Sequence, residues 1–446
     1  MLSGKKVLVL GLAKSGKAAV ELLSAVHATI TVNEFALQEQ IECYDEYIAR
    51  GIEMIVGGHP DDLFERDFDF VVKNPGINYH KPFVLRLKER GIPVYTEIEL
   101  AYRLSQPQNY IAITGTNGKT TTVTLIRDIL KNAGRQVCLA GNVGTPLSEL
   151  VLNEDLLHKS DYDVVLEMSN FQLLDIDAFH PRVATIINLT PDHLDYMASL
   201  EEYYTSKTRI YMNQDHNDIY LQNKDDVVLK EYLQKYPPQA KIVSFSLEQE
   251  ADCMIKNDAI YYQGQHIINL DDIKIVGRHN IQNMMIAICA CIHSGIDVQS
   301  IHDTLAAFTG VEHRIEFVRE YQGVKYYNDS KATNTDASII ALKAFKQPVI
   351  LLMGGFDKGL DLQEMSTYNS CIKKLVTFGA AGKRFKEDMH HQDAYYEETL
   401  KDAVNKAFEI SEPGDIILLS PSTSSFDEFK GYEERGRIFK QYVNEK

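Results

Sequence analysis

A glycine-rich segment near residue 115 carries the clearest chemistry in this sequence. It reads Ile111-Ala-Ile-Thr-Gly-Thr-Asn-Gly-Lys-Thr-Thr121 and leads from an apolar run into a helical pattern. Backbone N–H groups at the start of a helix favour a bound anion. Lys119 could reach the β- and γ-phosphates of a nucleotide, and the Thr120 hydroxyl could bind Mg²⁺. The segment therefore predicts an ATP-binding loop made by Gly115, Thr116, Asn117, Gly118, Lys119, Thr120 and Thr121.

This loop departs from the usual phosphate-binding pattern, because Ile113 stands where that pattern has its first glycine. A glycine-rich turn that only closes a strand–helix unit is the alternative interpretation. The Lys-Thr pair at the start of the helix favours phosphate binding.

A second glycine-rich loop, Gly11-Leu-Ala-Lys-Ser-Gly16, follows the first apolar run of the chain. Ala13 replaces the middle glycine of the dinucleotide pattern, and the strand about twenty residues further on offers Asn33 and Glu34. Three alternatives stay open here: a nucleotide-diphosphate site, a nicotinamide dehydrogenase, and helix–sheet packing without a ligand.

The elements that must position these loops form one repeating pattern. Short Val/Ile/Leu-rich runs alternate with helical segments, and they include residues 5–11, 69–76, 109–120, 163–169, 183–190, 348–355, 374–380 and 415–421. Continuous apolar runs that end in Gly, Ser, Thr or Asn are typical of buried parallel strands, so we predict an α/β fold. Ligands should then bind beyond the carboxyl ends of the strands. Breaks in the pattern predict domains at 1–107, 108–310 and 311–446.

Composition excludes several classes of protein. The 446 residues are 44% hydrophobic and 24% charged, as in soluble globular proteins of two to four domains. A net charge of -17 argues against nucleic acid and anionic membranes as partners. No apolar run approaches the ~18 residues of a membrane span. The six cysteines form no CxxC pair, which favours reduced thiols. We therefore expect a cytoplasmic protein that inserts into no membrane.

Several motifs, in this order along the chain, resemble the Mur ligase family. They are GTNGKTT (115–121), EMSNFQL (167–173), NLTPDHLD (188–195), GRHNIQN (277–283), HR (313–314) and NDSKATN (328–334). The family's ATP loop also lacks the first glycine, whereas Asn170 replaces a serine of its second motif. The resemblance covers the whole chain and implies three domains. These are a Rossmann-like N-terminal domain for UDP, a P-loop ATPase-like central domain with a mostly parallel sheet, and a Rossmann-like C-terminal domain for the amino acid.

Within that family, four segments are similar to the branch that adds D-glutamate: residues 11–18, 74–76, 141–146 and 420–436. The Asp-Asn-Pro-Arg sequence that marks the diaminopimelate-adding branch is absent. The resemblance implies that ATP phosphorylates the L-alanine carboxylate of UDP-N-acetylmuramoyl-L-alanine. The amine of D-glutamate then attacks the acyl phosphate through a tetrahedral intermediate and releases phosphate, as a step of peptidoglycan precursor synthesis. We expect a monomer.

The resemblance also implies two Mg²⁺ ions. Thr120 and Glu167 offer hard oxygen ligands for an ion between the β- and γ-phosphates. His193 and Lys207 are expected to bind the second ion. Lys207 matches a lysine that CO₂ carbamylates in the family, which turns a cation into an anion that can hold a metal. From the sequence alone, an exposed helix lysine is the alternative for Lys207.

The remaining family matches are contacts to the three substrates. The expected ATP contacts are Asn280, Asn283, Arg314 and Asp329. The expected contacts to the UDP-substrate are Ala13, Lys14, Asn33, Glu34, Asn74, Gly76 and Asn142. The expected D-glutamate contacts are Lys331, Thr333, Lys358, Ser425, Phe426 and Tyr432, and Lys331 could also stabilise the acyl phosphate.

Rival functions stay open. Another Mur-type ligase, or a folylpolyglutamate synthase, would share the ATP loop, but residues 1–107 argue against the synthase, which normally lacks a separate UDP domain. A dehydrogenase would leave the loop at 118–120 without a role. A non-catalytic nucleotide-binding regulator is disfavoured because Lys119, Glu167, His193 and Lys207 are all retained.

Overall fold

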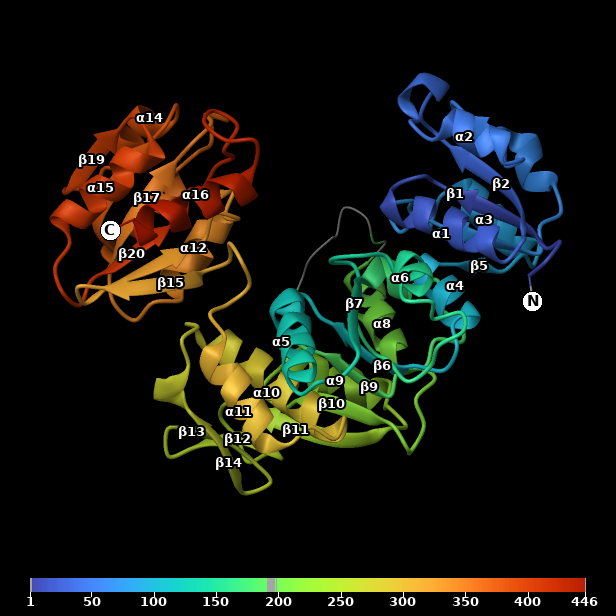
Figure 1. Cartoon of the computed structure of the whole chain (residues 1–446), viewed down its shortest axis with the longest axis horizontal. Coiled ribbons are helices and arrows are strands. Elements are labelled where there is room, and N and C mark those ends of the chain that lie inside the picture. The colour runs from blue at the N-terminus through green and yellow to red at the C-terminus, as the bar shows by residue number, and fades with distance from the viewer. Residues whose placement is uncertain (1, 191–196, 198, 446) are drawn as a thin grey trace. The chain divides into compact units, whose positions relative to one another are not determined.

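The computed structural model describes residues 2–190, 197 and 199–445. Its strands form three sheets in chain order, which confirms the predicted α/β fold (Figure 1). The chain divides into two compact units, residues 1–267 with 282–302 and residues 268–281 with 303–446. The three domain boundaries stay predictions. Among the described residues, no helix is long and apolar enough to cross a membrane.

The first sheet has the order β3-β2-β1-β4-β5, and all of its strands are parallel. Its strands are β1 (Lys6–Leu10), β2 (Thr29–Glu34), β3 (Glu53–Val56), β4 (Phe70–Lys73) and β5 (Val94–Tyr95), and the helices of this segment are α1 (Lys14–Ala25), α2 (Tyr44–Ala49), α3 (Pro82–Glu89) and α4 (Glu97–Leu104). Buried apolar side chains cover both faces. The strand order reverses between β1 and β4, which is where open α/β sheets bind ligands.

The second sheet has nine strands in the order β14-β13-β12-β11-β10-β9-β6-β8-β7. Its strands are β6 (Asn109–Thr114), β7 (Val137–Gly141), β8 (Asp163–Glu167), β9 (Val183–Ile186), β10 (Ile219–Asn223), β11 (Lys241–Ser246), β12 (Cys253–Lys256), β13 (Ala259–Tyr262) and β14 (Gln265–Asn269). The strands from β7 to β12 pair in parallel, whereas β12 and β13 pair antiparallel. The mostly parallel sheet that was predicted is therefore confirmed.

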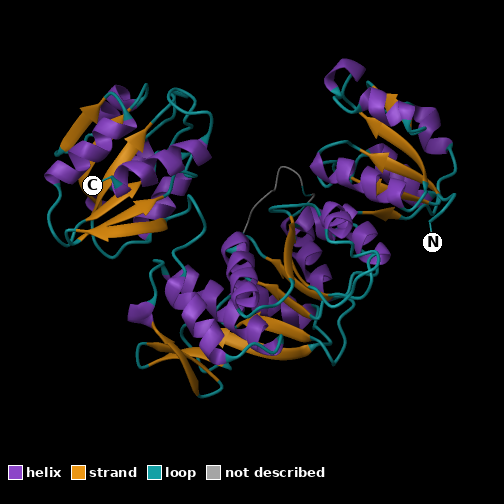
Figure 2. Cartoon of the chain, viewed as in Figure 1, coloured by secondary structure: helices purple, strands orange, loops and turns teal. Residues whose placement is uncertain are grey.

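Helices connect the strands from β6 to β11, and two further helices follow β14 (Figure 2). They are α5 (Lys119–Asn132), α6 (Leu147–Asn153), α7 (Asn170–Leu173), α8 (Leu200–Thr208), α9 (Val227–Lys235), α10 (Arg278–His293) and α11 (Val298–Ala307). Strand β6 lies between β8 and β9, so the loops that follow these three strands meet at one edge of the sheet.

The third sheet has the order β15-β16-β20-β17-β18-β19. Its strands are β15 (Glu316–Tyr321), β16 (Val324–Asn328), β17 (Val349–Gly354), β18 (Ile372–Phe378), β19 (Ala394–Glu397) and β20 (Ile416–Leu419), and its helices are α12 (Thr335–Lys343), α13 (Gln363–Ser366), α14 (Gly382–Asp388), α15 (Leu400–Ile410) and α16 (Tyr432–Asn444). β15 and β16 pair antiparallel, and the other pairs are parallel. Apolar clusters cover both faces.

Candidate active site

The predicted phosphate loop is a tight turn between β6 and α5. Ile113 lies inside β6, so the position of the missing glycine belongs to the strand and the turn begins at Gly115. Gly118 has a φ of 86°, in the left-handed region that favours glycine. A Cβ atom on Gly118 would lie 2.5 Å from Asn283 Oδ1. Backbone conformation and a close neighbour therefore both require glycine at this point.

Lys119 begins α5 and turns back over the loop. Its Nζ donates hydrogen bonds to the carbonyl oxygens of Gly115 and Thr116, both at 2.9 Å. Thr121 lies in the first turn of the same helix. The ammonium is thus held at the turn that is predicted to surround the nucleotide phosphates.

Asn188 holds this loop, although its residue type did not single it out. Its Oδ1 accepts hydrogen bonds from the backbone N–H groups of Thr116 and Asn117, at 3.1 and 2.9 Å. Its Nδ2 donates to the Asn117 carbonyl at 3.2 Å. An asparagine after a strand is typical of a turn, so sequence reasoning gave Asn188 no separate role. Asn188 therefore fixes the backbone of the turn at Thr116 and Asn117.

Glu167 ends β8 at the same edge of the sheet. Its side chain is buried, and its two carboxylate oxygens each accept one hydrogen bond. Thr120 Oγ1 donates to Oε2 and Asn142 Nδ2 donates to Oε1, both at 2.9 Å. A hydroxyl and a carboxylate beside a phosphate loop are the oxygen ligands that Mg²⁺ prefers. The predicted contact of Asn142 with the muramoyl-alanine part of the substrate stays a prediction.

The predicted ligands of the second metal ion are described only in part. His193 lies outside the described residues. Lys207 lies in α8 with only 2% of its surface exposed, so it is not the exposed helix lysine of the alternative interpretation. Its Nζ donates to the Gly115 carbonyl at 3.3 Å and lies 4.5 Å from the centre of the Tyr203 ring. The structure therefore brings Lys207 to the phosphate loop.

The first glycine-rich loop lies at the switch point between β1 and β4. A Cβ atom on Gly16 would lie 1.9 Å from the Gly11 carbonyl oxygen, so the start of α1 packs directly on the loop backbone. Ala13 precedes α1 as its N-cap residue. Glu34 Oε2 accepts a hydrogen bond from the Leu12 N–H at 2.5 Å. Glu34 thus fixes the loop that is predicted to bind UDP.

Asn33, which is predicted to contact the UDP-substrate, has no side-chain surface exposed to solvent. It is fully buried, and its Nδ2 donates to the carbonyl oxygens of Ile55 and Gly58 at 3.0 and 2.8 Å. Its Oδ1 lies 2.5 Å from His59 Nδ1. These bonds fasten β2 to β3 and to the turn after β3. The predicted contact of Asn33 with the UDP-substrate stays a prediction.

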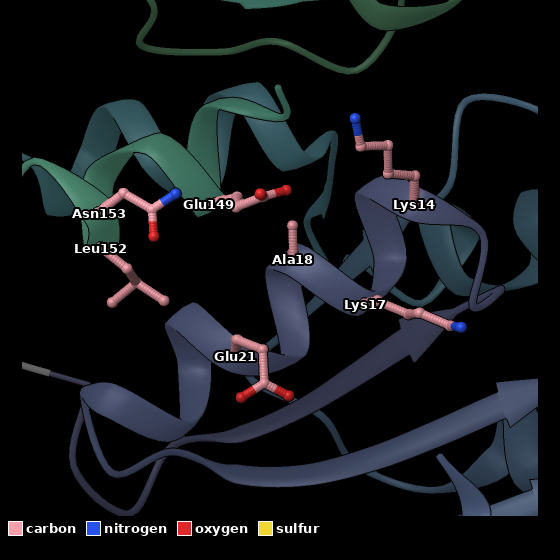
Figure 3. Close-up of a pocket in the computed structure, with 7 residues that line it drawn as sticks. All are labelled: Lys14, Lys17, Ala18, Glu21, Glu149, Leu152 and Asn153. Atoms are coloured by element: carbon pink, nitrogen blue, oxygen red, sulfur yellow. The ribbon is translucent and has the colours of Figure 1, made fainter. Parts of the chain in front are cut away.

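Lys14 and Asn74 connect the glycine-rich loop to its neighbours. Lys14 Nζ donates to the Gly144 carbonyl at 2.7 Å. Figure 3 shows a pocket between α1 and α6, lined by Lys14, Lys17, Ala18, Glu21, Glu149, Leu152 and Asn153. Asn74 Nδ2 donates to Ser15 Oγ at 3.0 Å, and Asn74 Oδ1 accepts from the Gly76 N–H at 3.0 Å.

The predicted ATP contacts outside the loop have different environments. Asn283 Oδ1 accepts from Thr122 Oγ1 at 3.2 Å, whereas Asn280 Nδ2 donates to the Val276 carbonyl at 2.7 Å. Arg314 is exposed. Asp329 is buried and accepts hydrogen bonds from Ser420 Oγ at 2.7 Å and from the Ile315 N–H at 3.2 Å. Burial raises the pKa of Asp329 to about 7, although both hydrogen bonds act in the opposite direction.

The structure brings together only some of the predicted D-glutamate contacts. Lys331 Nζ lies 5.4 Å from the centre of the Tyr432 ring. Ser425 is buried, and its Oγ has no hydrogen-bond partner among the described residues. Thr333 is half-buried, whereas Lys358 and Phe426 are exposed. Buried hydroxyl groups normally form a hydrogen bond, so this unsatisfied Oγ is consistent with a polar ligand at Ser425.

Arg435 organises this region and was not predicted. It lies in α16 and is fully buried. Its guanidinium donates to Ser330 Oγ and to the carbonyl oxygens of Ser330 and Thr423, at 2.9–3.0 Å. A longer bond of 3.5 Å reaches the Gly354 carbonyl. Burial lowers the pKa of Arg435 to about 10, while nearby carboxylates oppose that shift. Arg435 therefore joins the loops that follow β16 and β20 to the end of β17.

Comparison with known proteins assigns this arrangement to a family. Residues 113–291 match the Mur ligase middle domain, and residues 313–423 match the glutamate ligase domain of Mur ligases. The chain is 40% identical over 445 residues to the UDP-N-acetylmuramoylalanine–D-glutamate ligase of Streptococcus thermophilus (strain ATCC BAA-491 / LMD-9), with 98% of this chain and 97% of the relative covered. The chain belongs to the Mur ligase family.

This Mur ligase is similar to further relatives of known name. It is 40% identical over 448 residues to the UDP-N-acetylmuramoylalanine–D-glutamate ligase of Bacillus thuringiensis (strain Al Hakam), with 99% of this chain and 97% of the relative covered. The MurF ligase of Thermotoga maritima, solved with ADP, has a TM-score of 0.57 at 15% identity and covers 94% of this chain and 95% of its own. MurC from the same organism has a TM-score of 0.54 at 19% identity, with 99% and 100% covered. The two solved Mur ligases show the shared fold alone.

Proposed function

We propose that this Mur ligase joins D-glutamate to UDP-N-acetylmuramoyl-L-alanine at the expense of ATP, giving ADP and phosphate in peptidoglycan precursor synthesis. The observation that carries this proposal is 40% identity, over nearly the whole chain, to two enzymes named for that reaction. The geometry of the phosphate loop supports it, because Lys119, Thr120 and Glu167 lie together at one sheet edge.

The central residues have distinct tasks in this proposal. Thr120 and Glu167 would hold a Mg²⁺ ion, which when bound neutralises charge on the β- and γ-phosphates. Lys119 orients the γ-phosphate and offsets its charge. From the family resemblance, we also assign Lys331 to the stabilisation of the acyl phosphate. Preorganised cations suit both chemical steps, because each step gathers negative charge in a small space.

The finer part of the proposal concerns Lys207. We place a carbamate on its Nζ, which together with His193 would hold a second Mg²⁺ ion. Burial of Lys207 beside the Gly115 carbonyl supports this assignment. A bare ammonium so close to a metal ion would oppose it by like charge, whereas a carbamate attracts it.

The substrate contacts complete the proposal. UDP would occupy the switch point between β1 and β4, where Ala13, Lys14, Glu34 and Asn74 surround the glycine-rich loop. D-glutamate carries two carboxylates, which suit the cations and hydroxyls among Lys331, Thr333, Lys358, Ser425, Phe426 and Tyr432. We propose a cytoplasmic monomer.

Amino-acid-dependent phosphate release tests the whole proposal. The assay contains ATP, Mg²⁺ and UDP-N-acetylmuramoyl-L-alanine, with D-glutamate, L-glutamate, L-lysine or diaminopimelate added one at a time. We expect release with D-glutamate only. Release with another amino acid would retain the ligase reaction and refute the D-glutamate assignment, and no release with any of them would refute the reaction itself.

A further inference from the structure

A buried lysine holds the turn after β4 from the inside. Lys73 is the last residue of β4, and only 1% of its side chain is exposed. Its Nζ donates to the Ile77 carbonyl at 3.0 Å and to the Asn74 carbonyl at 3.4 Å. The Ile77 N–H also donates to the Asn74 carbonyl at 3.0 Å. One ammonium thus fastens both ends of residues 74–77, which we call the Asn74 turn.

The counterion of Lys73 comes from the segment that carries the second sheet. Asp175 follows α7, its side chain is 1% exposed, and its carboxylate lies 3.2 Å from Lys73 Nζ. The same carboxylate lies 2.7 Å from Nζ of Lys88, which is 26% exposed. A buried cation without a carboxylate is strongly unfavourable. Burial lowers the pKa of Lys73, and Asp175 opposes that shift.

The Asn74 turn forms one wall of the switch point. The Asn74 N–H donates to the Leu10 carbonyl at 2.9 Å, and the Asn74 side chain donates to Ser15 Oγ. A Cβ atom on Gly11 would lie 3.1 Å from Asn74 Cβ, so the turn touches the glycine-rich loop. Any displacement of the turn would therefore change the shape of the predicted UDP site at the start of α1.

A second contact ties the chain just beyond this turn to the central helices. His80 Nε2 lies 2.8 Å from Glu202 Oε1, and Glu202 belongs to α8, the helix of Lys207. Residues 73–80 are thus anchored at both ends on the segment that carries the phosphate loop. The half-exposed His80 contact is expected to be weaker than the buried Lys73–Asp175 pair.

We propose that Lys73, held in place by Asp175, is a positioning residue for the UDP part of the substrate. It fixes the Asn74 turn against the glycine-rich loop. Through Asp175, it also fixes the position of that loop relative to the segment that carries the phosphate loop. This role rests on the proposed function. Lys73 is buried and its ammonium binds the backbone of the Asn74 turn, so we expect its effect to fall on substrate binding.

The variant Lys73→Met tests this role, because it keeps the side-chain length and removes the ammonium. We expect KM for UDP-N-acetylmuramoyl-L-alanine and the Kd of UDP to rise by about tenfold, the factor that one charge-assisted hydrogen bond represents. KM for ATP and kcat should stay at their wild-type values. Lys5→Met is the matched control, because Lys5 forms an exposed ion pair with Asp69 in the same sheet segment.

A double variant separates positioning from stability. Lys73→Met leaves Asp175 buried beside Lys88 alone, so its melting temperature should fall. Lys73→Met with Asp175→Leu removes both buried charges, which often restores stability. We expect the double variant to regain the melting temperature while KM for the UDP-substrate and the Kd of UDP stay raised. Recovery of both binding constants together with stability would overturn the proposal, as would wild-type constants in Lys73→Met.

The UDP titration also keeps the two proposals apart, because calorimetric binding of UDP needs no turnover. A wild-type protein that binds UDP but releases no phosphate with D-glutamate would refute the proposed reaction. The Kd of UDP for Lys73→Met would decide the role of Lys73 in either case.

Discussion

Thr120 Oγ1 donates a 2.9 Å hydrogen bond to Glu167 Oε2, which joins the start of α5 to the end of β8. The two residues are 47 positions apart in the chain and meet because β6 and β8 are parallel neighbours. A hydroxyl and a carboxylate are oxygen ligands of the kind that Mg²⁺ prefers, which supports the metal site proposed for this pair.

The first prediction concerns this pair. Glu167→Gln keeps the shape of the side chain but removes its charge, so we expect kcat to fall by about 100-fold or more, as for loss of a main electrostatic stabiliser. Phosphate release is measured against Mg²⁺ concentration. Because a metal ligand is lost, the variant should bind Mg²⁺ more weakly and need a higher Mg²⁺ concentration for its half-maximal rate. Glu149→Gln, on α6, is the control and should keep the wild-type rate. A Glu167→Gln enzyme with normal rate and metal dependence would exclude Glu167 as a ligand.

The second prediction concerns Lys207. We expect Lys207→Ala to be inactive and to regain part of its activity with added formate or acetate, because a free carboxylate can replace the carbamate. The wild-type enzyme should lose activity in CO₂-free buffer and recover it with bicarbonate. Lys119→Ala is the matched control, since a missing cation cannot be replaced by a carboxylate. Equal behaviour of the two variants would argue against carbamylation.

The third prediction concerns the asparagine that holds the phosphate loop. Asn188→Ala removes hydrogen bonds to the N–H groups of Thr116 and Asn117. We expect KM for ATP to rise by about 30-fold, because two hydrogen bonds worth roughly 1 kcal/mol each are lost, while KM for the UDP-substrate is unchanged. The exposed Asn217→Ala is the control. A lower KM for ATP would instead show that Asn188 competes with the phosphate for these donors.

The fourth prediction is a pH dependence of stability. Glu97 in α4 is fully buried, accepts a short hydrogen bond from the Ser148 N–H, and has its pKa raised by burial to about 7. Because the folded-state pKa lies above the unfolded value of 4.5, the stabilising contribution is present below that value and is lost as pH rises towards 7.

Glu97→Gln should therefore gain stability relative to wild type between about pH 5 and 7, by at most about 3 kcal/mol, and the gain should stay constant above that range. Thermal unfolding of both proteins across this pH range measures the difference. A difference that does not change with pH would show that Glu97 has the same pKa in the folded and unfolded chains.

The parts of the fold that were predictable are those where one apolar run makes one strand. The runs at 163–169 and 183–190 correspond to β8 (Asp163–Glu167) and β9 (Val183–Ile186), because a strand buried on both faces needs continuous apolar residues. The antiparallel pair of β12 and β13 was not predicted. Its strands have only four residues each, and β12 mixes buried with exposed positions, so neither strand carries a long apolar run.

The site divides in the same way. The position of Glu167 at the carboxyl end of a strand was predictable, because it directly follows a strong strand pattern, whereas its metal-binding role stays a prediction. Asn188 and Arg435 were not predictable, because Asn117 and Ser330, which they bind, are far away in the sequence and are brought close only by the folded sheet. A residue type reveals charge and shape, whereas the partners of a buried guanidinium depend on the tertiary structure.

The position of Arg435 near the end of the chain determines when the loops that it joins can be completed during synthesis. The loops after β16 and β20 and the end of β17 are all synthesised before α16, yet the guanidinium that joins them arrives only with that last helix. During translation the phosphate loop and its predicted metal ligands can therefore fold while the predicted D-glutamate pocket is still incomplete. A nascent chain that stops before residue 435 would contain the predicted ATP-binding loop. Its predicted pocket for the D-glutamate amine would still be incomplete.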